Sequence, residues 1–358
     1  MFHSLIIANS LFNSTFYIFN LPYLCAMVKI RDIELGEFPL LLAPMEDVSD
    51  PPFRALCKKH GADLMYTEFI SSEGLIRDAI KSRQKLDIFD YEKPIGIQIF
   101  GGDEDAMAMS AKIVDATNPD LLDINFGCPV KKVVCKGAGA GVLKDVDLMV
   151  RLTKACINST KLPVTVKTRL GWDHSMINIM EVAERLQDIG VEALSIHGRT
   201  RAQMYKGEAD WSYIAEVKNN PRIKIPIFGN GDIDTPEKAV EYKNRYGVDG
   251  IMVGRASIGY PWIFNEIKHF MATGEHLDLP SVKDRVEAAR DHLMMSVKWK
   301  GERLGVVEMK RHYTNYFKGI AHFKEYRTKL VTSFDLQEIL DLLSYVEENS
   351  EEFIFSNP

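Results

Sequence analysis

Eight short apolar runs recur along the chain, and they constrain its fold more than any other feature. Longer stretches with helical periodicity separate them, for example residues 103–117 and 235–247. Near-continuous apolar strands that alternate with helices predict a parallel sheet covered by helices. The runs span residues 39–45, 63–69, 94–100, 120–126, 163–169, 192–198, 225–231 and 249–255.

Eight strand and helix units match a closed (β/α)8 barrel, whose usual size is about 250 residues. An open doubly wound sheet is the alternative, and it favours a G-x-G-x-x-G sequence after the first strand. The first run continues as "APMEDVSD", which has no such sequence. We therefore predict an α/β fold with a TIM barrel over residues 27–275.

The pattern changes after residue 275, where strand-like runs give way to helical periodicity. We predict a C-terminal all-helical domain over residues 276–358. Residues 281–330 hold twelve Lys or Arg against six Asp or Glu, whereas residues 331–358 hold seven acidic residues and no Lys or Arg. The first part of this domain, residues 281–330, is therefore basic, and its last part, residues 331–358, is acidic.

Residues 1–26 are apolar and aromatic but contain no Lys or Arg. A secretory signal has a basic start, and a spanning helix needs about 20 mostly apolar residues, so this segment fits neither. We expect Met27 to be the true start and residues 1–26 to be a non-native or unstructured leader. A membrane anchor is the weaker alternative.

Charge and cysteine content limit the possible partners. A formal net charge of −6 gives no overall reason to expect nucleic-acid binding, so such a partner must be argued from local charge. The five cysteines are odd in number and form no C-x-x-C pair, which argues against a disulfide framework and for a reducing, cytoplasmic location. Cys128 and Cys135 do not match zinc-ligand spacing, so we predict no metal.

Polar residues stand where the predicted strands end, which is where TIM barrels carry their chemistry. They include Gln98, Asn125, Lys167 and His197. A buried lysine is costly without a partner, so we interpret Lys167 as facing an anion or an electron-rich ring. The alternative is a solvated strand end.

Glycine-rich turns follow the last two predicted strands, in "FGNGD" and "MVGRASIG". Barrels commonly build a phosphate site there, because glycine lets backbone N–H groups approach the ligand. Arg255 adds guanidinium donors. The loop after His197 is basic and aromatic, which suits a phosphate-rich ligand. A histidine buried in the core is the alternative interpretation of His197.

Cys128 lies in "DINFGCPVKKVVCKGAGAG" and has four possible roles: packing residue, metal ligand, disulfide partner or reactive thiol. Spacing excludes the metal and the odd count argues against a disulfide, while a place at a strand end disfavours simple packing. We predict that "KGAGAG" forms a hinged loop over the substrate. A plain long turn is the alternative.

Six motifs together resemble the tRNA-dihydrouridine synthases, which are flavoenzymes that reduce specific uridines in tRNA. The resemblance extends from about residue 41 to residue 343. The motifs are "APMEDVSDPPFR", "DINFGCPVKKV", "VKTRLGW", "HGRTRAQMYKGEADW", "FGNGDI" and "GIMVGRA".

The resemblance implies that FMN is the cofactor and that NADPH or NADH is the reductant. A basic surface for tRNA makes a monomer the simpler expectation. The resemblance also implies that Cys128 donates a proton to the uracil ring, a task for which a protonated thiol is suited. The implied RNA- or substrate-contacting residues are Asn125, Arg199, Arg201, Lys318 and Arg327, with Tyr313 and Tyr316 beside the basic residues of the helical domain. The implied FMN-binding residues are Pro44, Met45, Glu46, Gln98, Lys167, His197, Asn230, Gly231, Asp232, Gly254 and Arg255.

Two other functions are weighed against this one. A dihydroorotate or dihydropyrimidine dehydrogenase-like enzyme shares the barrel and FMN but acts on a free pyrimidine, and it needs no basic helical domain. An RNA-binding barrel without catalysis would not need Cys128, Lys167 and His197 together. Ribosomal RNA is the alternative RNA substrate.

Overall fold

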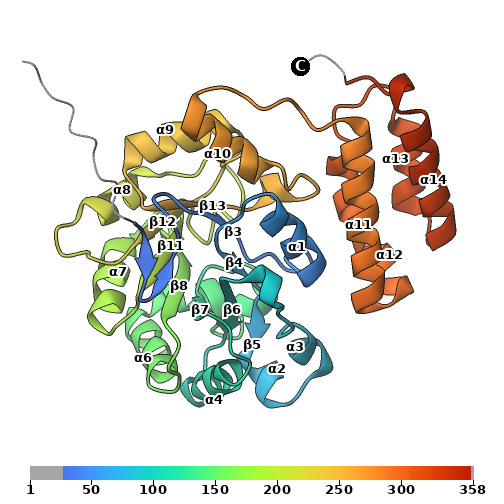
Figure 1. Ribbon diagram of the computed structural model, residues 1–358. Coiled ribbons are helices and arrows are strands. Elements are labelled where there is room, and N and C mark those ends of the chain that lie inside the picture. The colour runs from blue at the N-terminus through green and yellow to red at the C-terminus, as the bar shows by residue number, and fades with distance from the viewer. Residues whose placement is uncertain (1–26, 356–358) are drawn as a thin grey trace, which may run out of the picture.

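The computed structural model describes residues 27–355, which form a barrel with a helical domain beside it (Figure 1). The predicted leader, residues 1–26, lies outside the described residues. All eight predicted strands are present in one parallel sheet. They are β3 (Leu40–Leu42), β4 (Met65–Tyr66), β6 (Ile95–Phe100), β7 (Leu121–Asn125), β8 (Val164–Arg169), β11 (Ala193–His197), β12 (Ile227–Asn230) and β13 (Gly250–Val253).

The sheet closes into a ring. Its strand order is β3-β13-β12-β11-β8-β7-β6-β4, with the short strand β5 (Ile70–Ser71) also paired to β6. The two ends meet where the Leu42 N–H donates to the Leu64 carbonyl at 2.9 Å and Leu41 pairs with Leu64 in parallel. The predicted barrel is therefore confirmed, and the open sheet is excluded.

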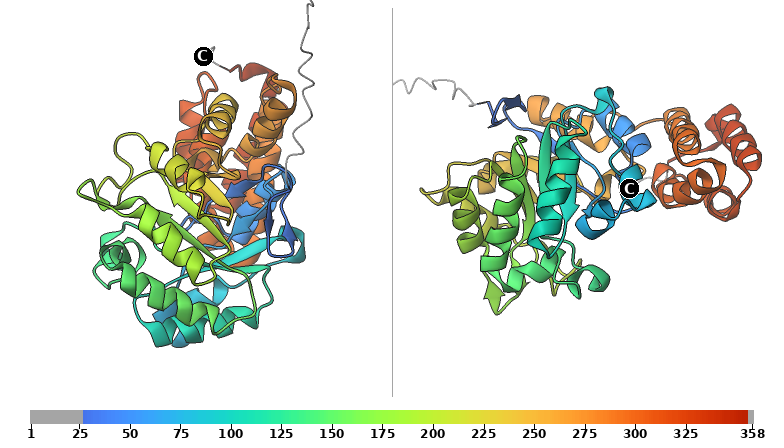
Figure 2. Two further views of the ribbon diagram at one scale, coloured as in Figure 1. Left: turned by 90° about the vertical axis from the view of Figure 1, so that its left-hand side faces the viewer. Right: turned by 90° about the horizontal axis from the view of Figure 1, so that it is seen from below.

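Amphipathic helices cover the outside of the barrel (Figure 2). In α7 (Ile179–Asp188) the buried residues Ile179, Val182, Ala183 and Leu186 recur at the spacing of one helical face. Within residues 27–355 no helix is long and apolar enough to cross a membrane. The other covering helices are α1 (Pro51–Lys59), α2 (Ser72–Ile76), α3 (Ile80–Gln84), α4 (Glu104–Asp115), α6 (Val146–Ile157), α8 (Ser212–Asn219), α9 (Pro236–Tyr246) and α10 (Ile263–Thr273).

Short elements complete the barrel. A hairpin of β1 (Lys29–Ile30) and β2 (Ile33–Glu34) packs its apolar side chains against Leu41, Leu64 and Leu121. This contact fills the barrel near the strand starts, at the end remote from the polar strand ends. The remaining elements are β9 (Gly171–Asp173), β10 (Met176–Ile177), α5 (Lys131–Val134) and the 3-10 turns η1 (Asp90–Glu92), η2 (Gly139–Lys144), η3 (Arg255–Ser257) and η4 (Ser350–Glu352).

The C-terminal domain has a core of its own. Its helices are α11 (Val282–Lys300), α12 (Glu302–Tyr316), α13 (Lys324–Thr332) and α14 (Leu336–Glu348), and the boundary expected at residue 275/276 falls between α10 and α11. Tyr313 and Tyr316 are fully buried in this core beside Leu293 and Leu343. The expectation that these two tyrosines flank an RNA-binding surface is therefore wrong, because they supply packing instead.

The helical domain is attached to the barrel through helix α1, which packs against α11 (Figure 1). Asp50 caps α1 by accepting from the Phe53 N–H at 3.0 Å, and its second oxygen lies 2.6 Å from Nζ of Lys300 in α11. Phe53 stacks on His292 of the same helix with ring centroids 5.7 Å apart. The interface thus combines a buried ion pair with aromatic packing.

Replacing Lys300 by alanine should destabilise the protein by about 3 kcal/mol, because Asp50 would remain buried without its cation. Side chains of the pair are only 7% and 6% exposed. Urea unfolding of Lys300→Ala, compared with the exposed neighbour Lys298→Ala, measures the effect. Equal midpoints for the two variants would show that the ion pair contributes nothing to stability.

Candidate active site

A cavity of about 580 Å³ opens at the carboxyl ends of the barrel strands. Strand β8 and the loops after β3, β4, β7, β11, β12 and β13 all contribute to its lining. With one exception, every residue expected to bind the cofactor lines it, and Asn125 and Cys128 do so too. The lining set includes Pro44, Met45, Glu46, Asn125, Cys128, Lys167, His197, Asn230, Gly231, Asp232, Gly254 and Arg255.

Gln98 is the exception, because it lies beneath the cavity rather than on its wall. Its side chain is fully buried inside the barrel. Its Nε2 donates to Asp123 at 2.5 Å, and its Oε1 accepts from Nδ2 of Asn125 at 2.7 Å. Both ends of the Gln98 amide are therefore bonded to other side chains.

Lys167 projects from β8 into the cavity, where Nζ donates to Oδ1 of Asn230 at 3.2 Å. Asn230 is held in turn by donating to the Met252 carbonyl at 2.8 Å. Burial lowers the pKa of Lys167 to about 8, and the neighbouring Arg169 contributes to the decrease. The ammonium group of Lys167 is therefore held in one orientation, and its lowered pKa makes it a stronger acid than an exposed lysine.

Arg169 lies two residues further along β8 and ties two loops together. Its Nε donates to the Gly127 carbonyl at 2.7 Å, and its Nη1 donates to the carbonyls of Thr200 and Met204. Burial lowers the pKa of Arg169 to about 10. Tyr205 lies over this guanidinium and over that of Arg255, with its ring 5.7 and 5.1 Å away.

The concentration of positive charge keeps His197 neutral. Burial, followed by the charges of Arg169, Lys167 and Arg199, holds the pKa of His197 well below its usual range. Arg199 Nη1 lies 3.3 Å from Nε2 of His197, so this ring nitrogen is the acceptor. The other ring nitrogen therefore carries the single proton.

Asp232 follows β12 and is the carboxylate that balances these cations. It accepts from Arg199 at 2.6 Å, from the Ala209 N–H at 2.8 Å and from Arg255 at 3.0 Å. Burial acts to raise the pKa of Asp232, but these hydrogen bonds and the two arginines outweigh it and hold the pKa below its usual range. Asp232 thus fixes the buried Arg199 and orients Arg255, whose side chain stays 56% exposed.

The Cys128 thiol lies at the cavity wall and is 7% exposed. Burial raises the pKa of the thiol, while the nearby charges of Arg169 and Lys167 partly offset the increase. Oδ1 of Asn125 accepts from the Cys128 N–H at 2.8 Å and from the Gly127 N–H at 3.0 Å. The thiol is therefore protonated at neutral pH and carried by a turn that Asn125 holds.

The "KGAGAG" segment packs against this turn. Ala138, Gly139 and Ala140 are buried, and the Ala140 N–H donates to the Cys128 carbonyl at 3.0 Å. Gly139 has a φ of 55°, and a Cβ there would lie 3.0 Å from the same carbonyl oxygen. In this part of the segment glycine permits close packing against the Cys128 turn, and the hinged cover stays a prediction.

The residues expected to contact RNA are placed very differently from one another. Arg199 is 2% exposed and donates to internal acceptors, which contradicts the expected contact with RNA. Arg201 is partly exposed and stacks on Trp172 at 4.6 Å. Lys318 is exposed, whereas Arg327 is partly buried and donates to the Phe317 carbonyl at 3.2 Å.

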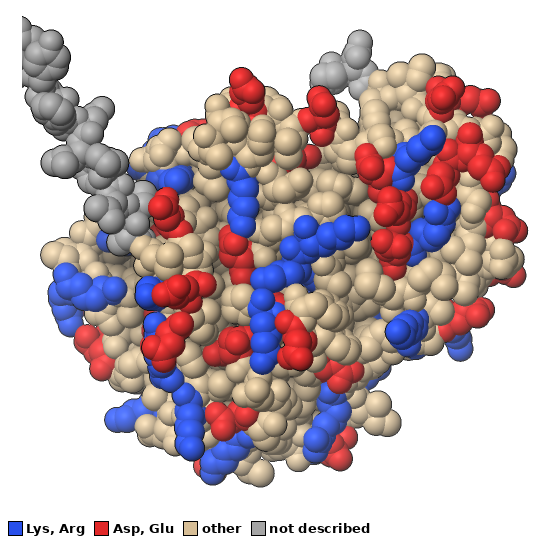
Figure 3. Space-filling model, in the orientation of Figure 1, with Lys and Arg blue, Asp and Glu red and all other residues tan. Residues whose placement is uncertain are grey.

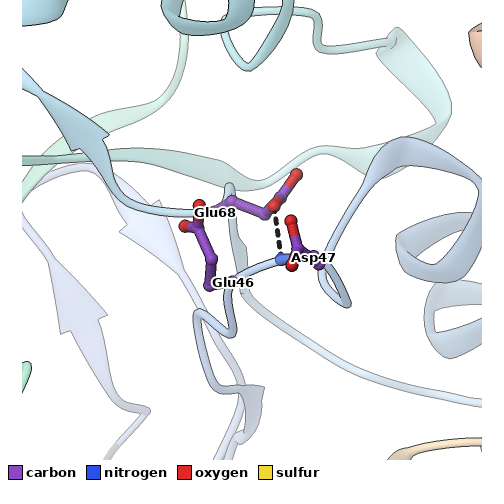
Figure 4. A group of neighbouring side chains, drawn as sticks. All are labelled: Glu46, Asp47 and Glu68. Carbon is purple, nitrogen blue, oxygen red and sulfur yellow. Dashed lines mark hydrogen bonds between the residues drawn. The ribbon is translucent and has the colours of Figure 1, made fainter. Parts of the chain in front are cut away.

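Three acidic side chains gather beside the cavity. Carboxylate oxygens of Glu46, Asp47 and Glu68 lie within 4.8 Å of one another, and the Asp47 N–H donates to Glu68 (Figure 4). Lys85 pairs with Glu46 at 2.6 Å and with Glu68 at 3.4 Å, while Arg311 of the helical domain faces Asp47 at 3.6 Å. Two cations thus partner these carboxylates, as in an ordinary ion-pair network.

Sequence patterns gave no direct signal for two residues of this site. Asp123 is hidden in an apolar run, and Tyr205 was noted only as part of a basic loop. The alternation of Asp123 with Asn125 along β7 is the one available signal, since residues two apart in a strand face the same side.

Comparisons with known proteins identify the family of this chain. A family model described as "Dihydrouridine synthase (Dus)" matches residues 41–354. A probable tRNA-dihydrouridine synthase from Rickettsia conorii is 37% identical over 302 residues, which are 84% of this chain and 90% of the relative. tRNA-dihydrouridine synthase B from Pseudomonas aeruginosa is 39% identical over 290 residues, which are 81% of this chain and 87% of the relative.

Solved structures share the fold at low sequence identity. Histamine dehydrogenase from Rhizobium sp. 4-9 matches with a TM-score of 0.54 and 11% identity over 76% of this chain and 51% of that protein. Such a match establishes the barrel alone. The family model and the sequence relatives go further, and they confirm the resemblance carried by the six motifs: the chain belongs to the dihydrouridine synthase family.

Proposed function

We propose that the protein reduces the C5–C6 double bond of uridines in tRNA, with FMN as its cofactor and Cys128 as its proton donor. The single observation that carries this proposal is the protonated thiol at the wall of a cationic cavity. The names of the sequence relatives support tRNA as the substrate. They give no support to an enzyme that acts on a free pyrimidine.

The cavity fits a phosphorylated flavin in its chemistry. Its volume of about 580 Å³ lies within the usual range for cofactor sites. Gly254 leaves open space, because a Cβ there would reach only Ala43 and Met45, at 3.6 and 3.8 Å. We assign the phosphate to the loops of Gly231 and Gly254 with Arg255, where glycine and a guanidinium suit an anion.

Lys167 is the residue that we assign to the flavin ring. Its Nζ is oriented by Asn230 and lacks a carboxylate within ion-pairing distance among the described residues. A fixed cation favours the anionic form of a reduced ring. When reduced, FMN supplies the hydride that is added to C6 of uracil.

Cys128 completes the reduction by giving its proton to C5. Hydride addition at C6 leaves a pair of electrons at C5, and the S–H bond breaks as the new C–H bond forms. The resulting thiolate is stabilised by Arg169 and Lys167, whose charges act to lower the pKa of Cys128. A proton from solvent then restores the thiol for the next cycle.

The helical domain is the part that we assign to holding the RNA. Figure 3 shows basic and acidic side chains interspersed over one face of the molecule, with several acidic groups on the helical domain. We assign the contact with phosphates to exposed cations such as Lys318 and to the partly exposed Arg201. Arg327 is a second candidate, although its bond to the Phe317 carbonyl gives it a structural task as well.

NADPH is the reductant that we propose, and the cytoplasm is the proposed site of action. Cys57, Cys128, Cys135 and Cys156 are all free thiols, which suits a reducing compartment. We further propose that one chain acts alone, since barrel and helical domain together supply both the cavity and the exposed cations.

Replacing Cys128 by alanine should lower dihydrouridine formation by about 10²- to 10⁴-fold, the usual contribution of a general acid. Flavin absorbance should persist, because the thiol is not assigned to cofactor binding. Mass spectrometry of nucleosides from treated tRNA measures the product. Cys135→Ala is the matched control, since Cys135 is exposed and does not line the cavity. Full product from Cys128→Ala would contradict the acid role.

Replacing Lys318 by alanine should weaken tRNA binding and reduce the slope of log affinity against log salt by about one. Each phosphate contact that is lost releases one counterion fewer. Filter binding over a range of salt concentrations measures the slope. Lys112→Ala, an exposed lysine on α4 of the barrel, is the control. An unchanged slope in Lys318→Ala would remove this residue from the RNA-binding surface.

A further inference from the structure

We propose that Asp123 is a positioning residue that sets the direction of a buried hydrogen-bond chain and thereby orients the turn carrying Cys128. The chain runs inside the barrel from β8 through β7 and β6 and back to the end of β7. The role of Cys128 in it rests on the proposed function, but the hydrogen-bond chain itself does not.

The register of the strands brings the four residues of the hydrogen-bond chain together. Gln98 of β6 pairs with Asp123 of β7, and Asp123 pairs with Thr165 of β8. Asn125 lies two residues beyond Asp123, so both side chains face the barrel interior. All four are buried, with exposures between 0% and 5%. Gln98, Asp123 and Thr165 lie away from the cavity, so water does not replace a missing partner there, whereas Asn125 also lines the cavity.

Each link has a defined donor and acceptor. Asp123 accepts from the Thr165 hydroxyl through Oδ1 and from Nε2 of Gln98 through Oδ2. Oε1 of Gln98 then accepts from Nδ2 of Asn125, at 2.7 Å. Oδ1 of Asn125 is left to accept from the N–H groups of Gly127 and Cys128.

The carboxylate fixes this direction because an ionised carboxylate can only accept hydrogen bonds. The amide of Gln98 must turn its NH2 group toward Asp123, so its oxygen faces Asn125. Asn125 must then donate to Gln98 and present its own oxygen to the Cys128 turn. Burial raises the pKa of Asp123 to about 6, so the group is still ionised at neutral pH.

Gly127 shows why the orientation matters. Its N–H is held by Asn125 while its carbonyl is held by Arg169 at 2.7 Å. The residue before Cys128 is thus fixed on both sides. An inverted Asn125 amide would point its NH2 group at the N–H groups of Gly127 and Cys128 and would release the turn.

The donor-to-acceptor direction of the hydrogen-bond chain can be reversed by exchanging the carboxylate of Asp123 with the amide of Asn125. In Asn125→Asp, the new carboxylate faces Oε1 of Gln98, and no orientation of Gln98 satisfies carboxylates at both 123 and 125. In the double variant Asp123→Asn/Asn125→Asp, the amide at 123 donates to Gln98, and Gln98 donates to the carboxylate at 125. Every group then has a partner again, with both N–H groups of the turn still bound.

Hydrogen exchange at Gly127 and Cys128, together with dihydrouridine formation, tests the proposal. Asn125→Asp should speed exchange at these two amides and lower turnover, each by about tenfold or more, as expected for a broken buried hydrogen bond. The double variant should restore exchange to within about threefold of the starting protein. Asp123→Asn alone should have a smaller effect than Asn125→Asp, because its oxygen can still accept from Gln98.

The proposal would be overturned if these amides exchanged as fast in the double variant as in Asn125→Asp. Packing or a direct contact of Asn125 would then explain the loss of amide protection. Restored exchange without restored turnover would support the hydrogen-bond chain and would assign the lost turnover to the new carboxylate at position 125, which faces the cavity. Should Asn125→Asp fail to fold, Asp123→Ala provides a second test. It should speed exchange at Gly127 and Cys128, and unchanged exchange there would overturn the proposal.

Discussion

Positive charge buried at the mouth of a closed barrel is the constraint on which the rest of this site depends. Lys167, Arg169 and Arg255 line one cavity, and Arg199 lies buried behind it, where it shares Asp232 with Arg255. Removing such charges from water is costly unless they are paired or hydrogen-bonded. Burial is the main cause of the low pKa of His197 and of the decrease for Lys167, and the neighbouring cations add to both shifts.

The same cations hold the loops in place. Arg169 donates to carbonyls before Cys128 and after His197, and Arg199 donates to the carbonyl of Gly207. The loops thus satisfy the guanidinium groups while the guanidinium groups order the loops. Such mutual support leaves Lys167 and Arg255 as the cations best placed to meet an anionic ligand.

Much of this arrangement is predictable from sequence because strand ends in a parallel barrel converge. The eight apolar runs placed Cys128, Lys167, His197 and Asp232 at one end of the fold before any contact was known. Exposure was harder to predict, because it depends on packing between distant segments. Arg199 and Tyr313 occur in polar, charged stretches, yet both are buried. Asp123 was missed because its neighbours in the strand are apolar.

We expect hydride and proton to be delivered to a uracil within RNA at this cavity. The most direct test of this expectation is to reduce the flavin-loaded protein without oxygen and to mix it rapidly with unmodified tRNA. We expect tRNA to reoxidise the flavin with stoichiometric formation of dihydrouridine, whereas free uracil and orotate should not. A flavin that stays reduced with tRNA but is reoxidised by a free pyrimidine would contradict this expectation.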